Sequence, residues 1–324
     1  MAPTQTAAVP IGTASRLSVS RAGAGHDASP LTEAEVLAEA RAMQLAPGGV
    51  VGQAQLLAAL YKPDLDFDEL GRMVAGDPAL SARTLRVANS AFYRRSGEVG
   101  TVSRALQVLG MATVKGIAAA ACLDRAVTTQ AGAAGEEARR LRLHSLEVAC
   151  AAQLLARQAR PALEAEAFMC GVLHDIGMLV QWKLRTHQMA ECRARGQLEA
   201  AGAAVGVSHE RCGELLTHAW NLPDWLQTAI ARHHQGEFPA GDAGDLAALT
   251  RLAETLSGDL DVPATRTAPD GGAPPAGAPP AGAAALAERH GGELARLGLT
   301  SHHLERCLAE LPAMVERFHA TDHA

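Results

Sequence analysis

The chain of 324 residues is predicted to be all-α. Apolar residues recur at helical spacing along most of it, whereas strand-forming residues never alternate convincingly with polar ones. Aromatic residues make up only 3% of the chain, so Leu, Val, Ile, Ala and Met must form the core. Hydrophobic residues account for 48% and charged residues for 20%, a balance typical of a globular protein and not of a disordered one.

The first helices are expected after a disordered tail. Residues 1–30 are rich in Ala, Thr, Ser, Gly and Pro, a composition that cannot bury a core. The segment "LTEAEVLAEARAMQL" begins at Leu31, with Thr32 as N-cap and Glu35 three residues later, which is the pattern of a capping box. Short amphipathic helices are predicted at 50–61 and 66–76.

The next helices complete an N-terminal helical lobe, predicted to span residues 31–130. In "DPALSARTLRVANSAFY" Asp77 is the expected N-cap and Pro78 the first helical residue. Asn89 is expected to satisfy backbone groups at the end of this helix, where Phe92 and Tyr93 would pack between the lobes. Residues 101–123 predict two helices broken at Gly110, and residues 128–135 are the expected boundary between the lobes.

A second helical lobe is predicted over residues 131–258. Its helices are expected at 136–159, 162–180, 183–200, 208–220, 223–235 and 245–258. The stretch 259–285 is a Pro/Ala/Gly-rich linker that cannot pack a core. Helical periodicity then returns in 286–324, where Thr300 or Ser301 would cap a helix.

Charge and hydropathy exclude several classes of partner. The formal net charge of −6 disfavours sequence-independent binding to nucleic acid. No stretch of 18 or more apolar residues and no signal-peptide core occurs, so neither a membrane nor export is expected. The six cysteines form no CxxC pair, which favours reduced, buried thiols in a cytoplasmic protein.

Histidine and aspartate residues at predicted helices or helix ends form a candidate metal site. They are His144, His174, Asp175, His209, His233 and His234. Taken singly, a histidine in a helix is usually a surface residue or a satisfied core residue and not a metal ligand. The adjacent pairs on apolar helices favour convergence, and Gly177 is expected to provide the exit from the helix that lets His174 and Asp175 converge.

Such a set could hold a mono- or binuclear transition-metal centre. Imidazole nitrogens suit Fe, Mn or Zn, and one carboxylate can bridge two ions. A two-metal centre supports phosphoester hydrolysis because it stabilises the attacking and leaving oxygens. The remaining histidines show no comparable grouping and are expected to be solvated; they are His26, His187, His218, His290, His302, His303, His319 and His323.

The order of the motifs resembles the HDOD family, the HD-related output domains of bacterial signalling. The motifs run from about residue 40 to 258: "GDPALSARTLRVANSAFY", "ALQVLGM", "HSLEVA", "GVLHDIG", "GVSHERCGELL" and "WNLPDWLQTAIARHH". "LARLGLTSHHLERCLAEL" extends the match towards the end. The resemblance implies an all-helical fold, an N-terminal helical lobe followed by an HD-like helical bundle, in a family generally regarded as regulatory and non-catalytic.

The relation of that family to HD and HD-GYP phosphohydrolases implies a ligand role for each residue. His144 is similar in position to the first histidine of the HD-GYP pattern, and His174 with Asp175 to its HD pair. His209 matches the histidine that precedes the "G..LL" turn.

The end of the pattern is matched less completely. His233 and His234 match its paired histidines, and Glu254 stands where the closing aspartate is expected. Met178 replaces the lysine of "HDIGK", so a phosphate-contacting amine is missing. No GYP motif follows His234, which argues against cyclic di-GMP cleavage in the HD-GYP manner.

Three hypotheses of function follow. The leading one is a regulatory output module that binds bacterial signalling proteins, with little or no catalysis. The alternative is a metal-dependent phosphodiesterase or phosphohydrolase of the HD type. In the third, a metal has a purely structural role. Because no phosphoacceptor-type βα repeat or basic recognition helix is evident, the input is expected to arrive through a partner or a ligand.

Deletion of residues 264–282 is predicted to leave the melting temperature nearly unchanged. The segment cannot pack a core, and loop length affects closure entropy only weakly. Thermal unfolding of the full chain and of the deletion variant checks this. A large loss of stability would show that the segment is part of the core.

Overall fold

The computed structural model describes residues 29–45, 59–60, 62, 64–89, 93, 99–128, 132–196, 201–259 and 282–319. In these ranges every regular element is helical and no strand is present, which confirms the all-α prediction. Most of the predicted tail, most of the predicted helix 50–61 and most of the predicted linker lie outside the described residues.

The N-terminal part contains α1 (Glu33–Leu45), α3 (Phe67–Ala75), α4 (Pro78–Ala88) and the long α5 (Val102–Thr128). The part that follows contains α6 (Gly132–Ala159), a short 3-10 turn η1 (Pro161–Leu163), α7 (Glu164–Leu173), α8 (Gly177–Leu184), α9 (Thr186–Ala194), α10 (Ala201–Val205), α11 (His209–Ala219), α12 (Asp224–Arg232) and α13 (Asp242–Asp259). The C-terminal helices are α14 (Ala283–Arg289), α15 (Gly291–Leu297) and α16 (Ser301–His319).

Two of the predicted helix caps, Thr32 and Asp77, are confirmed. The Thr32 amide donates to Glu35 Oε2 at 2.8 Å, and the Glu35 amide donates to Thr32 Oγ1 at 3.3 Å, which completes the capping box. Asp77 caps α4 by accepting from the amides of the second and third helical residues, and Pro78 is the first helical residue. These ends are encoded locally, because each cap satisfies backbone amides that have no partner within the helix.

Asn89 joins the end of α4 to the start of α5. Its Oδ1 accepts from the Val99 amide at 2.8 Å, while its Nδ2 donates to the carbonyls of Leu85 and Val99. The expected role of Asn89 is confirmed. The Tyr93 side chain is half-buried against the core, whereas Phe92 lies outside the described residues.

The break inside α5 also occurs where it was predicted. Gly110 has φ 77° and ψ 162°, a backbone conformation that interrupts the helix and favours glycine. α5 therefore consists of two helical segments. It packs against α3 and α4 and also against α6 and α7.

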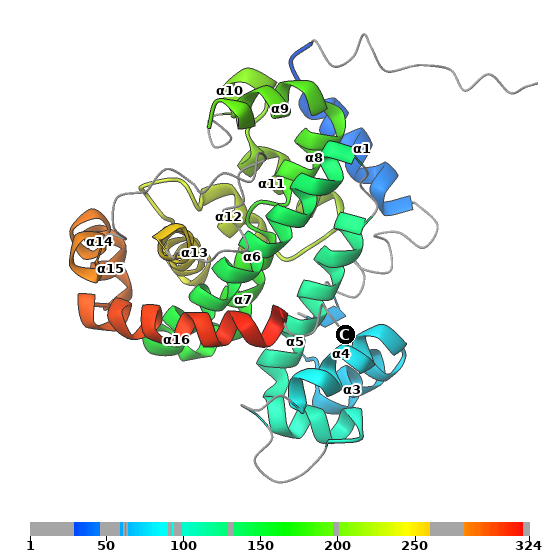
Figure 1. The fold of residues 1–324 in the computed structure, drawn as a ribbon, viewed down its shortest axis with the longest axis vertical. Coiled ribbons are helices and arrows are strands. Elements are labelled where there is room, and N and C mark those ends of the chain that lie inside the picture. The colour runs from blue at the N-terminus through cyan, green and yellow to red at the C-terminus, as the bar shows by residue number, and fades with distance from the viewer. Residues whose placement is uncertain are drawn as a thin grey trace, which may run out of the picture.

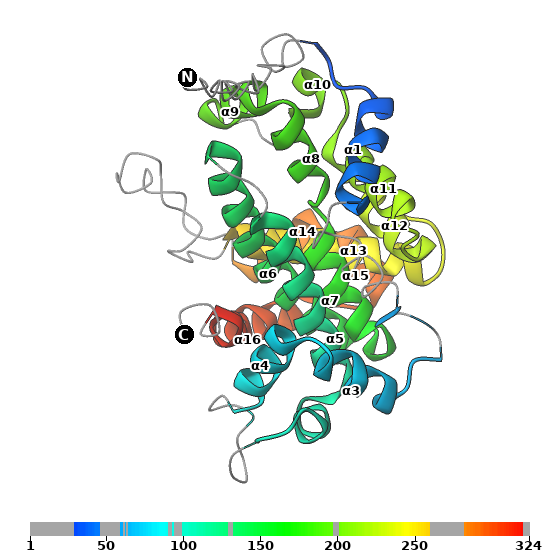
Figure 2. The same cartoon turned by 90° about the vertical axis from the view of Figure 1, so that its right-hand side faces the viewer.

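The helices form three groups along the long axis (Figure 1). α6, α7 and α13 pack on one another in the middle, and the pair α6–α7 has the most extensive contact in the fold. α3 and α4 lie with part of α5 at one end, and α8 to α11 lie at the other, as the rotated view also shows (Figure 2). An N-terminal helical lobe followed by an HD-like bundle is thus the observed arrangement.

Helix α1 departs from this order, because it packs on α11 and α8 at the far end of the molecule from α3 and α4 (Figure 2). The buried guanidinium of Arg185 donates to Glu35 Oε1 at 2.8 Å and to the Ser29 carbonyl at 2.8 Å. The Trp220 indole donates to the Ala40 carbonyl at 3.2 Å. These partners lie more than 140 residues apart in sequence, so local patterns could not have placed α1.

The C-terminal helices return to the middle group. Arg160 bonds Asp245 Oδ2 at 2.7 Å, and Arg296 of α15 bonds Asp245 Oδ1 at 2.8 Å. α16 packs along α6, where the Cys307 thiol lies 3.8 Å from the Ala151 carbonyl. The domain boundaries placed at residues 130, 258 and 285 in the sequence analysis remain a prediction.

Two further expectations can be compared with the described residues. None of the described helices is long and apolar enough to cross a membrane. The cysteines whose side chains are described are free and buried, in agreement with the sequence analysis; they are Cys150, Cys170, Cys192, Cys212 and Cys307.

A buried carboxyl in the middle group makes stability depend on pH. Glu147 of α6 is 2% exposed and accepts from the Ser257 hydroxyl of α13 at 3.1 Å. Burial raises its pKa from 4.5 to about 7, although the Ser257 hydrogen bond opposes that shift. The folded chain therefore binds this proton more tightly than the unfolded chain, and stability falls as pH rises from 4.5 through 7.

Glu147→Gln is predicted to remove that loss, because the amide cannot ionise. The free energy of unfolding is measured in urea for both proteins. The value for the variant minus that for the wild type should increase between pH 5 and pH 8. Exposed Glu305→Gln is the matched control and should keep a constant difference. If the difference in free energy of unfolding between Glu147→Gln and the wild type does not change with pH, the Glu147 carboxyl does not titrate in this range.

Candidate metal centre

The His174–Asp175 pair lies in a tight turn between α7 and α8. α7 ends at Leu173 and α8 begins at Gly177, so the pair sits where the chain changes direction. The Ile176 amide donates to the Leu173 carbonyl at 3.1 Å, and the Met178 amide donates to the Asp175 carbonyl at 2.9 Å. Both side chains thereby point into the same buried space between helices.

The expected role of Gly177 as the helix exit is wrong. Gly177 is the first residue of α8 and does not have a positive φ. It is required for packing, because a Cβ there would collide with the His209 carbonyl and lie 2.6 Å from the Gly213 amide nitrogen. The missing side chain lets the start of α11 approach α8, which brings His209 to Asp175.

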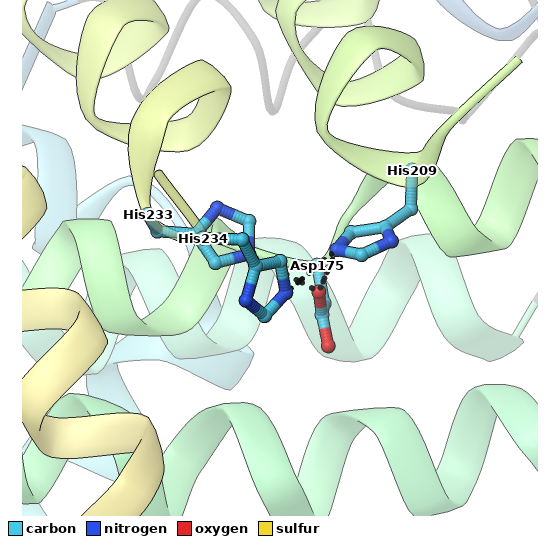
Figure 3. A group of neighbouring side chains, drawn as sticks. All are labelled: Asp175, His209, His233 and His234. Atoms are coloured by element: carbon cyan, nitrogen blue, oxygen red, sulfur yellow. Dashed lines mark hydrogen bonds and ion pairs between the residues drawn. The ribbon is translucent and has the colours of Figure 1, made fainter. Parts of the chain in front are cut away.

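A first group of ligand atoms surrounds one oxygen of Asp175 (Figure 3). His209 Nε2 lies 3.2 Å from Asp175 Oδ1, and His233 Nε2 lies 3.7 Å from the same oxygen. His234 Nε2 lies 3.1 Å from His209 Nε2. The four side chains come from the α7–α8 turn, the start of α11 and the end of α12, and each offers one atom within 4.8 Å of the others.

A second group uses the other oxygen of Asp175. His174 Nε2 lies 3.3 Å from Asp175 Oδ2, and His144 Nε2 of α6 lies 3.9 Å from it. Glu254 of α13 completes the group, again with one ligand atom of each residue within 4.8 Å of the others. Asp175 is the residue common to both groups, as a carboxylate bridging two ions would be.

The buried atoms of this cluster fit a metal. His174 Nε2, His233 Nε2 and Asp175 Oδ1 are buried without a hydrogen-bond partner among the described residues. His174 Nδ1 contacts the Gly171 carbonyl at 2.8 Å, and His233 Nδ1 contacts the Ile230 carbonyl at 2.6 Å. These carbonyls hold the proton on Nδ1 and leave Nε2 as the lone-pair donor, the usual arrangement of a ligating histidine.

Electrostatics favour the ligating forms of most of these groups. Burial, followed by the charge of His174, lowers the pKa of His144 to about 4. Burial, followed by His233, lowers the pKa of His234 to about 3, so both imidazoles are neutral at pH 7. Burial opposes charge on Asp175, but His174 holds its pKa well below the usual range.

His174 is the exception. Burial lowers its pKa, but the adjacent Asp175 carboxylate outweighs this effect and raises the pKa to about 9. In the metal-free chain this histidine therefore carries a proton near neutral pH, and a metal ion would displace that proton when it binds.

All seven residues predicted as ligands are brought together here, including Glu254, which was inferred only from the resemblance. One expectation about the other histidines is wrong. His290 is 4% exposed instead of solvated, because the junction of α14 and α15 folds against α13. His187, His218 and His302 are exposed, as expected.

A cavity of about 330 Å³ opens beside the centre and was not anticipated from the sequence. Four candidate ligand residues line it: His144, Asp175, His234 and Glu254. The other side chains of its lining belong to no recognisable motif: Glu137, Arg140, Leu141, Met178, Trp182 and Arg193. These residues are scattered over α6, α8 and α9, so only the packing of those helices reveals them.

Fold and centre together define an all-helical protein with an HD-type histidine–aspartate cluster. The chain belongs to the HDOD domain family, whose model matches residues 51–236. The match covers more than half of the chain and lies inside the range of 40–258 proposed from the motifs.

Solved structures share this fold. An HDOD domain protein of unknown function from Geobacter sulfurreducens has a TM-score of 0.68 at 21% identity, covering 90% of this chain and 97% of its own. A candidate phosphohydrolase from Shewanella amazonensis SB2B has a TM-score of 0.62 at 22% identity, and the match covers 89% of this chain and 98% of the other. A candidate signal transduction protein from Marinobacter aquaeolei VT8 has a TM-score of 0.61 at 20% identity, and the match covers 89% of this chain and 64% of the other.

A curated protein of Treponema pallidum is 23% identical over 189 residues, which is 56% of this chain. The matched region spans 36% of that relative's length. At these identities the likeness to the solved structures establishes the fold.

Asp175→Ala is predicted to remove bound metal from both ligand groups, because its carboxylate is the residue that they share. Metal content measured by elemental analysis should fall below about a fifth of the wild-type value, as expected for loss of a bridging ligand. Exposed His218→Ala is the matched control and should retain full metal content. Retention of metal by Asp175→Ala would show that the carboxylate is not a ligand.

Proposed function

We propose that this chain is a regulatory output module of bacterial signal transduction that acts by binding a signalling protein. In this proposal its HD-type centre holds one or two Fe, Mn or Zn ions and turns over little or no substrate. One observation carries the proposal: Met178 lines the cavity beside the centre, at the position where the family resemblance implies a lysine.

The side chain of Met178 cannot stabilise a phosphoryl group. Phosphoryl transfer requires charge-stabilising and positioning groups in addition to metal ions. A thioether carries no charge and donates no hydrogen bond. Met178 therefore adds an apolar side chain, and no cation, to the cavity wall.

The two arginines of the cavity do not replace the missing amine. Arg193 forms an ion pair with Glu137 at the cavity wall. Arg140 Nε lies 3.7 Å from Glu137 Oε1 and 3.7 Å from Glu136 Oε1. Because carboxylates already face both guanidinium groups, little net positive charge remains for a substrate.

The alternative function is a metal-dependent phosphodiesterase. It is favoured by the complete ligand set and by the cavity that opens directly onto it. Bound metal would supply an activated water and Lewis acidity towards a phosphoester. The residues of the chain would hold the ions: Asp175 between the two groups, with His209 and His174 on either side.

The two functions are distinguished by measuring metal content and turnover on the same preparation. The protein is purified without a metal-affinity column and reconstituted with Fe or Mn under reducing conditions. The proposal predicts stoichiometric metal with negligible hydrolysis of a generic phosphodiester and of a cyclic dinucleotide. Efficient hydrolysis by the wild type would replace the regulatory function with the enzymatic one.

Met178→Lys is predicted to raise phosphodiesterase activity above the wild-type level, because it adds a cation to the wall of the cavity. The matched control is Met178→Leu, which keeps an apolar side chain of similar volume and should leave activity unchanged. Equal activities in all three proteins, each with full metal content, would show that the missing amine does not limit turnover.

The remaining hypothesis is a metal with a purely structural role, and a separate measurement tests it. If the metal only ties the helices together, its removal should lower the melting temperature without any effect on partner binding. Metal below about 0.2 equivalents after reconstitution would contradict the metal claim and both the enzymatic and the structural-metal hypotheses, and it would leave a regulatory module in which His174 and Asp175 no longer bind metal.

A further inference from the structure

A second cavity shares His234, Glu254 and Gly258 with the cavity described above. Its volume is about 430 Å³, within the range of small-molecule sites. Its polar lining consists of His234, Arg251, Glu254, Thr255, Arg289 and His290. The walls thus come from α13, from the end of α12 and from the junction of α14 and α15, so the C-terminal helices complete the cavity.

His290 is the unusual residue in this lining. It is 4% exposed, and neither ring nitrogen has a hydrogen-bond partner among the described residues. The nearest charged group is Glu293, whose Oε1 lies 3.5 Å from His290 Nδ1. A buried imidazole without hydrogen bonds costs free energy, so its position on the cavity wall indicates a ligand that supplies the missing bond.

Two arginines give the cavity its charge. Arg251 donates from Nη1 to the His234 carbonyl at 2.8 Å, and its Nε lies 3.0 Å from Glu293 Oε1. In the part of the chain that the structure describes, no partner is assigned to Arg251 Nη2 or to the exposed guanidinium of Arg289. Planar guanidinium groups suit a phosphate because they present parallel N–H donors to two of its oxygens.

We propose that this cavity binds the phosphate group of a small phosphorylated molecule. In this arrangement Arg251 and Arg289 contact the phosphate oxygens and His290 contributes a hydrogen bond. The Glu254 carboxylate is the one acidic group on the wall, and the two arginines outnumber it. The site is distinct from the ligand cluster, although His234 and Glu254 border both.

The location gives such a ligand a physical effect on the fold. It would bridge α13 to the junction of α14 and α15, and it would lie beside the hydrogen bond that the Arg251 guanidinium donates to the His234 carbonyl. Ligand binding would therefore stabilise the docking of the C-terminal helices beside the metal centre. This is a route by which a metabolite could serve as the input of the module.

The test is isothermal titration of the full-length protein with inorganic phosphate, adenosine monophosphate and adenosine. Both phosphates should bind, and adenosine should not. Tighter binding of the nucleotide than of free phosphate would identify a phosphoester as the ligand, and equal binding would identify phosphate itself. Hydrogen exchange of the α14 and α15 amides should slow when either phosphate is present.

Variants locate the site. Arg289→Gln should weaken phosphate binding about tenfold, because it removes one charge-assisted contact from an exposed residue that is not needed for folding. Arg289→Lys should recover part of the affinity. Arg306→Gln, an exposed residue on α16, is the matched control and should bind like the wild type.

Two results would overturn the proposal. One is that neither phosphate binds. The other is that Arg289→Gln binds both phosphates as the wild type does while Arg193→Gln loses them, because the ligand would then occupy the cavity of the metal centre. Neither result depends on metal content or turnover, so failure here is distinguishable from failure of the proposed function.

Discussion

The convergence of five helical segments on the Asp175 carboxylate is the constraint on which the rest of the structure depends. Its two oxygens face different groups of imidazoles, with His209 at 3.2 Å from one and His174 at 3.3 Å from the other. The ligands come from α6, the α7–α8 turn, α11, α12 and α13. Buried charges and unpaired nitrogens at one point are costly, so this packing is stable only if these groups bind one another or a metal.

Close helix packing makes that convergence possible. A Cβ on Gly171 would collide with the Ala149 backbone, so the missing side chain lets α7 lie directly on α6. Gly177 does the same for α8 and α11. The surrounding helices then hold the arrangement: α1 is tied to α8 by the buried Arg185, and α15 is tied to α13 through Asp245.

The two cavities share His234 and Glu254 in their walls, so the centre borders both of them. The first cavity presents Met178 and arginines that are paired with carboxylates. The second presents Arg251, which is paired with Glu293, and the buried His290 beside the C-terminal helices.

The sequence by itself determined the helical class, the caps at Thr32 and Asp77, the break at Gly110 and the residues of the candidate metal site. These features depend on contacts within a few residues, or on residue types arranged in a fixed order along the chain. Tertiary structure decided what depends on distant partners. It placed α1 beside α11, buried His290, gave Gly177 its packing role and formed both cavities, because these features arise only where helices far apart in sequence come into contact.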